Sequence, residues 1–267
     1  MFEEQGYCML TRRTFLRASL SATATLFLAA HARAQNGMPA ELSFHTALPI
    51  VLLPELPPIP EPTPQPTAQP TPQPGDAAIL SASNGTVEQA FAWLAPRADP
   101  SYSDDAIWEI VQAYRNIGAN VGLDWFVAIA QMAHETGHLT SFWSQRPQRN
   151  PAGIGVTGVG QADPPADTNG WAYNTQRNRW ERGLSFGSWA GEAIPAHLGR
   201  LLAYALRDDQ ANPAQLSLIQ YALSKRGITD TKRGVATTWI GLNGRWADPG
   251  TTYGQTLLAL AQRMREG

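Results

Sequence analysis

The sequence is almost free of cysteine: its 267 residues include only one, Cys8. A single cysteine cannot close an intramolecular disulfide. Cys8 also precedes the arginine pair of a predicted export signal, so it would leave the protein with that signal. The mature protein would then have neither disulfides nor thiol chemistry, and its stability must come from a packed core.

The sequence also lacks an excess of basic charge and a long hydrophobic run. Beyond residue 34 it has 16 basic and 20 acidic residues, which gives no electrostatic reason to bind nucleic acid. The apolar run over residues 18–30 is too short and too rich in Ala, Ser and Thr for a transmembrane span. We therefore expect neither nucleic acid nor membrane as a partner of the mature form.

Residues 1–34 resemble a twin-arginine signal peptide. Residues 11–17, TRRTFLR, contain the arginine pair, and Ala32-Arg33-Ala34 is a small-x-small cleavage site after the apolar run. This pattern predicts an exported protein, extracellular or located in the cell wall or periplasm. An uncleaved signal anchor is the alternative.

Proline is abundant in residues 35–75, which we predict to be a disordered linker. Residues 49–75 include the tetrapeptides TPQP, TAQP and TPQP. Such a segment favours polyproline II and cannot pack a core, so it would serve as a spacer or an inert tether. The globular domain is expected over residues 76–267.

Capping residues and apolar spacing predict a mostly α (α+β) domain. Glycine and proline interrupt residues 150–187, where short alternating segments indicate a small, irregular β-lobe. Pro195 is expected to kink the fourth helix. The predicted helices cover residues 86–94, 103–116, 124–136, 188–206, 212–224 and 252–265.

The third predicted helix ends in a carboxylate on its apolar face. Trp125, Ala128, Met132 and Glu135 follow at spacings of three and four, and Gly137 is a plausible C-cap. Burial and the negative end of the helix dipole both disfavour the charged form of a carboxyl at this place. A carboxyl that keeps its proton near neutral pH is what a general acid requires. The alternative is an exposed glutamate at a helix end with no catalytic role.

The same residues match the zinc-peptidase motif HExxH, with His134, Glu135 and His138. In such an enzyme the two imidazoles bind zinc and the glutamate activates water. Gly137 stands between the histidines, where the helix would have to continue, and the positions that extend the motif hold neither His nor Gly. We therefore expect no metal, and keep the zinc peptidase as a rival hypothesis.

Two further short motifs lack the context that they need. Residues 153–158 match GxGxxG, but no βαβ unit surrounds them. Residues 183–187 match GxSxG, but the sequence around them does not predict an α/β sheet with the later acid and histidine. Neither a dinucleotide site nor a serine hydrolase is expected.

All nine tryptophans lie between Trp93 and Trp246, which favours a carbohydrate ligand weakly because flat aromatic faces stack on sugars. A series of motifs covers roughly residues 100–265. In order, the motifs are Ala130-Gln131, Glu135-Thr136-Gly137, Asn150-Pro151-Ala152-Gly153-Ile154-Gly155, Phe186-x-Ser188-Trp189, Ala196-His197-Leu198, Leu202-Ala203-Tyr204, Trp246-Ala247-Asp248-Pro249 and Tyr253-Gly254. In this order and spacing the series resembles the glucosaminidase domains of bacterial cell-wall hydrolases, glycoside hydrolase family 73 of the lysozyme-like superfamily.

The resemblance implies a lysozyme-like fold and an enzyme that cleaves β-1,4 bonds at N-acetylglucosamine in peptidoglycan glycan strands. Glu135 would be the general acid. Asn150 and Gly153 would line the floor of the cleft, and Tyr253 would position water or the N-acetyl group. No cofactor is implied, and we expect a monomer. A wall-binding module without catalytic activity is a second rival.

The second carboxylate of such a glycosidase is not fixed by the sequence. Asp163, Asp167 and Glu181 all lie in the predicted β-lobe, where some members of the family place that group. A mechanism assisted by the acetamido group of the substrate needs no second acid. All three residues therefore stay candidates.

Overall fold

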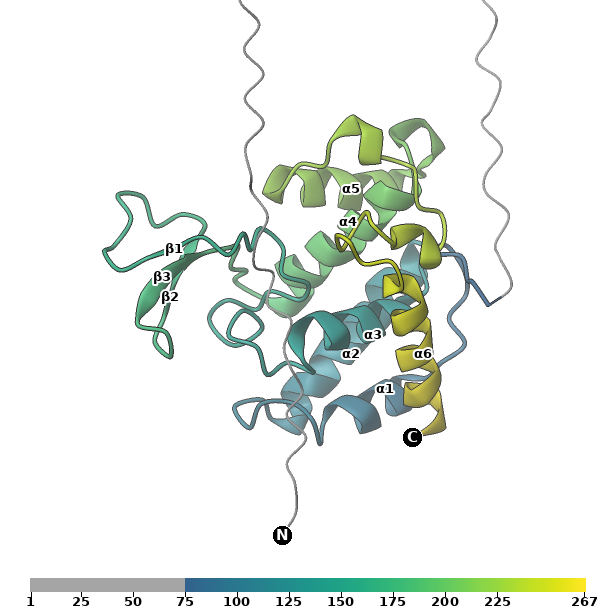
Figure 1. Cartoon of the computed structure of the whole chain (residues 1–267). Coiled ribbons are helices and arrows are strands. Elements are labelled where there is room, and N and C mark those ends of the chain that lie inside the picture. Colours follow the sequence, from purple (N-terminus) through teal and green to yellow (C-terminus); the bar gives the residue numbers. More distant parts are fainter. Residues whose placement is uncertain (1–74) are drawn as a thin grey trace, which may run out of the picture. The chain divides into compact units, whose positions relative to one another are not determined.

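The computed structural model describes residues 75–267, so the predicted signal and nearly all of the predicted linker lie outside the described residues. Six α-helices and a small antiparallel sheet form the described part (Figure 1), which confirms a mostly helical fold with a small β-lobe. The helices are α1 (Val87–Leu94), α2 (Asp104–Asn120), α3 (Trp125–Thr136), α4 (Ile194–Ala205), α5 (Pro213–Lys225) and α6 (Tyr253–Glu266).

The N-terminal ends of α1, α2 and α3 are fixed by the capping residues that the sequence suggests. Thr86 forms a capping box with Gln89 at the start of α1, and the side chain of Ser103 accepts a hydrogen bond from a backbone amide in the first turn of α2. Asp124 accepts from two backbone amides at the start of α3. These oxygens satisfy amides that would otherwise have no partner in the helix, so these three helices begin at a capping side chain.

Helix α4 differs from its prediction at the N-terminal end. A short π-helix, Trp189–Ala193, precedes it, and the α-helix proper begins at Ile194 with Pro195 in its first turn. Proline has no amide to donate and is tolerated only where that amide would be unpaired. The expected kink at Pro195 is therefore a change of helix type just before this residue.

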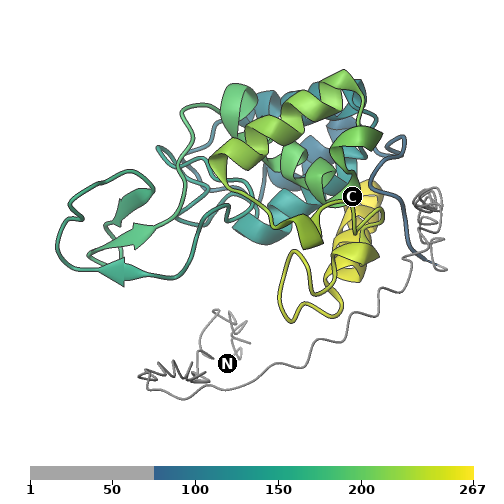
Figure 2. The same cartoon turned by 90° about the horizontal axis from the view of Figure 1, so that it is seen from above.

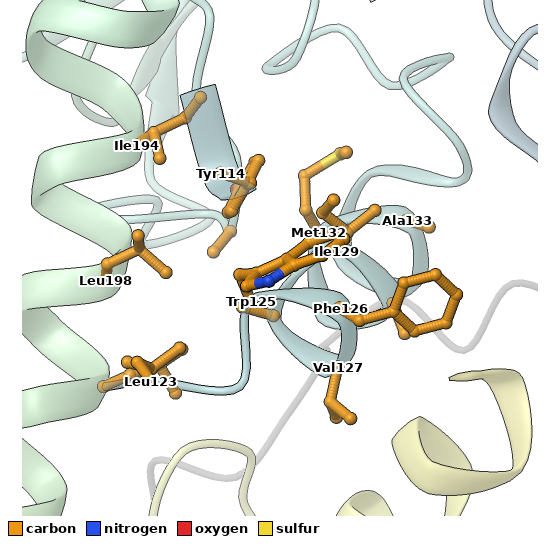
Figure 3. Close-up of a cluster of buried hydrophobic side chains, with 14 of the residues drawn as sticks. Tyr114, Leu123, Trp125, Phe126, Val127, Ile129, Met132, Ala133, Ile194 and Leu198 are labelled. Carbon is orange, nitrogen blue, oxygen red and sulfur yellow. The ribbon is translucent and has the colours of Figure 1, made fainter. Parts of the chain in front are cut away.

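Helix α3 forms the centre of the core. All residues of α3 from Trp125 to Ala133 are buried, and the helix packs against α2 and α6. Figure 3 shows its apolar side chains beside Tyr114 of α2 and Leu198 of α4. An element enclosed in this way has little freedom to shift, so whatever α3 presents at its C-terminal end is held firmly.

The β-lobe consists of β1 (Gly160–Gln161), β2 (Trp171–Asn174) and β3 (Arg179–Arg182), in the order β1-β3-β2. Figures 1 and 2 show this sheet standing at one side of the helices. No helix among residues 75–267 is both long enough and apolar enough to cross a membrane.

Helices α4 and α5 pack closely because Gly199 has no side chain. A Cβ atom at this residue would lie 2.0 Å from the carbonyl oxygen of Leu218 and 2.9 Å from Cβ of Ala222. The backbone of α5 cannot move aside to make room for this Cβ atom, whereas the end of a flexible side chain could. The glycine therefore sets the distance between these two helices.

We expect Gly199→Ala to lower the free energy of unfolding by about 3 kcal/mol, because overpacking against backbone forces α4 and α5 apart. Gly227→Ala is the matched control, since a Cβ there meets no atom within 4 Å. Urea unfolding of both variants measures the difference. Equal stability of the two variants would contradict the close packing at Gly199.

Candidate active site

Glu135 lies at the C-terminal end of α3, half-buried, with one carboxylate oxygen held by two donors. The hydroxyl of Tyr253 donates to its Oε1 at 2.6 Å, and the indole Nε1 of Trp246 donates to the same oxygen at 2.9 Å. Within residues 75–267 no hydrogen bond or ion pair involves Oε2. The carboxyl is therefore oriented through one oxygen while the other is available to a ligand.

The end of α3 has the predicted form. Gly137 is the C-cap and adopts a left-handed conformation with φ of 57°, which terminates the helix one residue after Thr136. Glu135 thus occupies the last turn, where the helix dipole is negative. The two hydrogen bonds to Oε1 act against the dipole by stabilising a negative charge.

Behind Tyr253 a buried chain of polar groups runs into the core. The side chain of Gln131 donates from Nε2 to the Tyr253 hydroxyl at 2.8 Å. His197 Nε2 lies 2.9 Å from Gln131 Oε1, and the hydroxyl of Tyr114 lies 2.8 Å from His197 Nδ1. Gln131, His197 and Tyr114 are fully buried. Each polar atom of this chain has a partner, as buried polar groups require.

The hydrogen bonds of this series all point in one direction, from Tyr114 toward Glu135. The Tyr253 proton points to Glu135, so its oxygen must accept from the Gln131 amide. The Gln131 carbonyl oxygen then accepts a proton from His197 Nε2, which leaves Nδ1 to accept from Tyr114. The imidazole is therefore neutral. Burial, with a smaller effect from the charge of Arg200, lowers the pKa of His197 to about 3, in agreement with that state.

Trp246 contributes an aromatic face as well as its donor. Its ring centroid lies 5.7 Å from the rings of both His197 and Tyr204, and the guanidinium of Arg200 lies 5.9 Å from its centroid. These contacts hold the indole in place. Because Trp246 is only partly buried, the remaining surface is accessible to a ligand.

The geometry does not fit the zinc site of an HExxH peptidase. Helix α3 ends at Thr136, and His138 has a φ of 60°, so the two imidazoles do not follow one another along a helix face. The ring of His138 lies 6.2 Å from that of Trp93, while His134 is exposed and lies near Tyr253. Among residues 75–267, no group of three His, Cys, Asp or Glu side chains is placed to hold a metal ion.

Asn150 holds together the turn formed by residues 150–155. It is fully buried, its amide donates to the carbonyl oxygens of Ile154 and Leu184, and its Oδ1 accepts from two backbone amides of the turn. All of its hydrogen-bonding groups are used, so it orients the turn and offers no free group to a ligand. Gly153, with φ of 59°, lies in this turn with open space at its Cβ position.

The three candidate second carboxylates have different surroundings. Glu181 is largely buried in the sheet, where Arg177 at 3.0 Å and Arg179 at 3.1 Å pair with its Oε1. Burial opposes its charge, but hydrogen bonds from Asn174 and the arginines outweigh that effect and lower the pKa of Glu181. Asp163 and Asp167 are exposed in the loop between β1 and β2. None of the three forms a hydrogen bond with Glu135 in the described structure.

Sequence reasoning placed Tyr253 near Glu135 but missed the contributions of three residues. The other side chains that take part in the hydrogen bonds of this site are Trp246, Gln131 and His197. Gln131 carried a signal, because it lies one turn before Glu135 in an otherwise apolar helix.

A scan against protein-family models and a search of curated proteins both found no match to this chain.

We expect acid to weaken the fold through His197. Between pH 6.5 and pH 3 the unfolded chain protonates this imidazole and the folded chain does not, so the free energy of unfolding falls as the pH is lowered. The slope from this group approaches about 1.4 kcal/mol per pH unit. Urea unfolding at pH 6.5, 5.5 and 4.5 measures it, with His197→Gln as the matched variant that keeps one donor and one acceptor. An unchanged slope in that variant would contradict the neutral buried imidazole.

Proposed function

We propose that the domain is a lysozyme-like glycoside hydrolase that cleaves β-1,4 bonds at N-acetylglucosamine in peptidoglycan, with Glu135 as the general acid. The observation that carries the proposal is the asymmetric environment of the Glu135 carboxyl. Its Oε1 is held by Tyr253 and Trp246, whereas its Oε2 has no partner among the described residues. The series of motifs that resembles the cell-wall glucosaminidases gives the substrate class.

In the proposed reaction the proton of Glu135 is carried on Oε2. It passes to the glycosidic oxygen as the bond from that oxygen to the anomeric carbon breaks, and the leaving sugar departs as an alcohol. The carboxylate that remains is stabilised by the hydrogen bonds that Tyr253 and Trp246 already donate to Oε1. Because these donors are fixed in advance, their reorganisation adds little to the barrier.

The developing positive charge on the sugar ring needs a nucleophile. Glu181 is bound to two arginines, so recruiting it would first require breaking two ion pairs. Asp163 and Asp167 remain as carboxylate candidates on the lobe. The acetamido oxygen of the substrate is the other candidate, and attack by that oxygen needs no second protein carboxylate.

Glu135→Gln is expected to reduce glycan cleavage about a thousandfold while wall binding is retained, because an amide cannot donate the acid's proton. The amide oxygen still accepts from Tyr253 and Trp246, so the fold should be preserved. Purified cell-wall sacculi are incubated with each protein, and the released fragments are identified by mass spectrometry. The sugar at the reducing end separates cleavage at N-acetylglucosamine from cleavage at N-acetylmuramic acid.

The same assay tests both rivals. Glu266→Gln is the matched control, since Glu266 is exposed at the end of α6. Unchanged lysis by Glu135→Gln would remove Glu135 as the general acid. Wall binding with no fragments from the wild type would point to a binding module. Activity that a chelator abolishes and zinc restores would favour the zinc peptidase, as would fragments cut in the peptide and not in the glycan.

Tyr253→Phe is expected to lower the rate of glycan cleavage about tenfold, because the variant loses one of the two hydrogen bonds that orient the Glu135 carboxyl. Tyr221→Phe is the control, because the Tyr221 hydroxyl has no hydrogen-bond partner among the described residues. The rate at which each variant releases fragments from sacculi at one fixed pH measures the effect. Equal rates for the two variants would show that Tyr253 does not act on Glu135.

A further inference from the structure

A cavity of about 470 Å³ lies between the root of the β-lobe and the C-terminal end of α5. The lobe contributes Arg182, at the end of β3, and several glycines, and α5 contributes Lys225 with the following Arg226. Its volume is within the range of sites that bind small molecules. The cavity contains none of the residues that contact Glu135, so it is a separate feature of the molecule.

The charged side chains that line the cavity are all cations. Arg182, Lys225 and Arg226 belong to the lining, and no Asp or Glu does. The ion pairs within residues 75–267 join Arg177 and Arg179 to Glu181, and Arg233 to Asp208. The three cations of the cavity therefore have no carboxylate partner in the described structure.

Two acidic residues outside the lining, Asp167 and Glu192, bind backbone amides. Asp167 of the lobe accepts a hydrogen bond from the backbone amide of Asn169, and Glu192 accepts from the backbone amide of Gly187. Two of the three cations lie over aromatic rings. The Lys225 ammonium is 5.0 Å from the centroid of Tyr221, and the Arg182 guanidinium is 6.0 Å from that of Trp171. Such contacts orient a cation but do not neutralise it.

The dipole of α5 explains the position of only two of the three cations. Lys225 and Arg226 follow the end of α5, where cations are favoured by the helix dipole. Arg182 belongs to a strand on the other side of the cavity, and no helix end explains its charge. Cations that meet from two separate elements repel one another, and a bound anion would remove that repulsion.

The glycines of the lining have different surroundings. A Cβ atom at Gly183 would lie 2.5 Å from the indole of Trp143, and one at Gly155 would lie 2.8 Å from Cγ of Leu184, so at these two positions the space is already filled. A Cβ atom at Gly170 would meet nothing within 4 Å. The lining also includes Thr157 and Asn169, which offer polar groups beside the cations.

We propose that this cavity binds a carboxylate of the acidic peptide attached to the glycan strand. The anionic character of the ligand follows from the cavity, whereas its attachment to a glycan rests on the proposed function. A guanidinium matches a carboxylate with two parallel hydrogen bonds, and a lysine adds a point charge of the right sign. The site would select strands that carry peptides over bare strands.

Calorimetric titration of the full-length protein in its Glu135→Gln form tests this proposal without turnover. The probe is the disaccharide N-acetylglucosaminyl-N-acetylmuramic acid bearing L-Ala-D-Glu, which has two free carboxylates. Its dimethyl ester, chitotetraose and inorganic phosphate are the comparison ligands. We expect the acid to bind at least about tenfold more tightly than the ester, which corresponds to about 1.4 kcal/mol. Its affinity should also fall as salt is raised.

The double variant Arg182→Gln/Lys225→Gln should remove the preference for the acid and leave chitotetraose binding unchanged. Lys232→Gln, at another exposed lysine, is the matched control. Circular dichroism and thermal unfolding confirm that the variants fold. Equal binding of acid and ester, or an unchanged preference in the double variant, would overturn the proposal. Phosphate binding as tightly as the acid, and displacing it, would also overturn the assignment to a carboxylate.

The result is independent of the assay for Glu135. Loss of the preference for the acid in the double variant would establish the anion site even if Glu135→Gln left wall lysis unchanged. Conversely, a catalytic Glu135 with equal binding of acid and ester would retain the hydrolase and remove the anion site. Each hypothesis can therefore fail without the other.

Discussion

The candidate site depends on one carboxylate oxygen, Oε1 of Glu135, and on the two groups that donate to it. Trp246 and Tyr253 are separated from Glu135 by 111 and 118 residues in the sequence. They reach it only because α6 packs against α3 and the preceding loop folds over the end of α3. The geometry of a single functional group is thus a product of the complete helical core, and no short peptide could reproduce it.

Burying Gln131, His197 and Tyr114 opposes folding, because these polar side chains lose their hydrogen bonds to water. Three polar side chains are removed from water beside an apolar helix, which is unfavourable unless each is fully hydrogen-bonded. They are bonded to one another in a single direction, and the last donor of the series, Tyr253, acts on Glu135. A change at His197 in the core would therefore reach the carboxyl through two intermediate side chains.

Most of the fold could be predicted from local features of the sequence. Caps and apolar spacing located the six helices, with the largest error at the start of α4, and glycine and proline located the β-lobe. The π-helix before α4 was missed because a proline in a helical pattern predicts an interruption but not its form. The lysozyme-like superfamily, the substrate and the reaction were inferred from a resemblance, and they remain proposals.

The site could be predicted only in part, because its contacts join distant segments. Glu135 was found from its place on an apolar face, and Tyr253 through the order of motifs. The donor role of Trp246 and the partners of His197 depend on how α4 and the loop before α6 pack, which no local pattern contains. Asn150 was expected at the floor of the cleft. In the structure it is fully buried, and its side-chain hydrogen bonds all go to backbone groups.

The position of Asn150 has a mechanical consequence for the β-lobe. The chain enters the lobe near Ile154 and leaves it near Leu184, and the one Asn150 amide donates to the carbonyl oxygens of both residues. The entering and leaving segments cannot slide past each other without breaking those bonds. If the lobe tilts relative to the helices, both segments must therefore move together as one rigid unit.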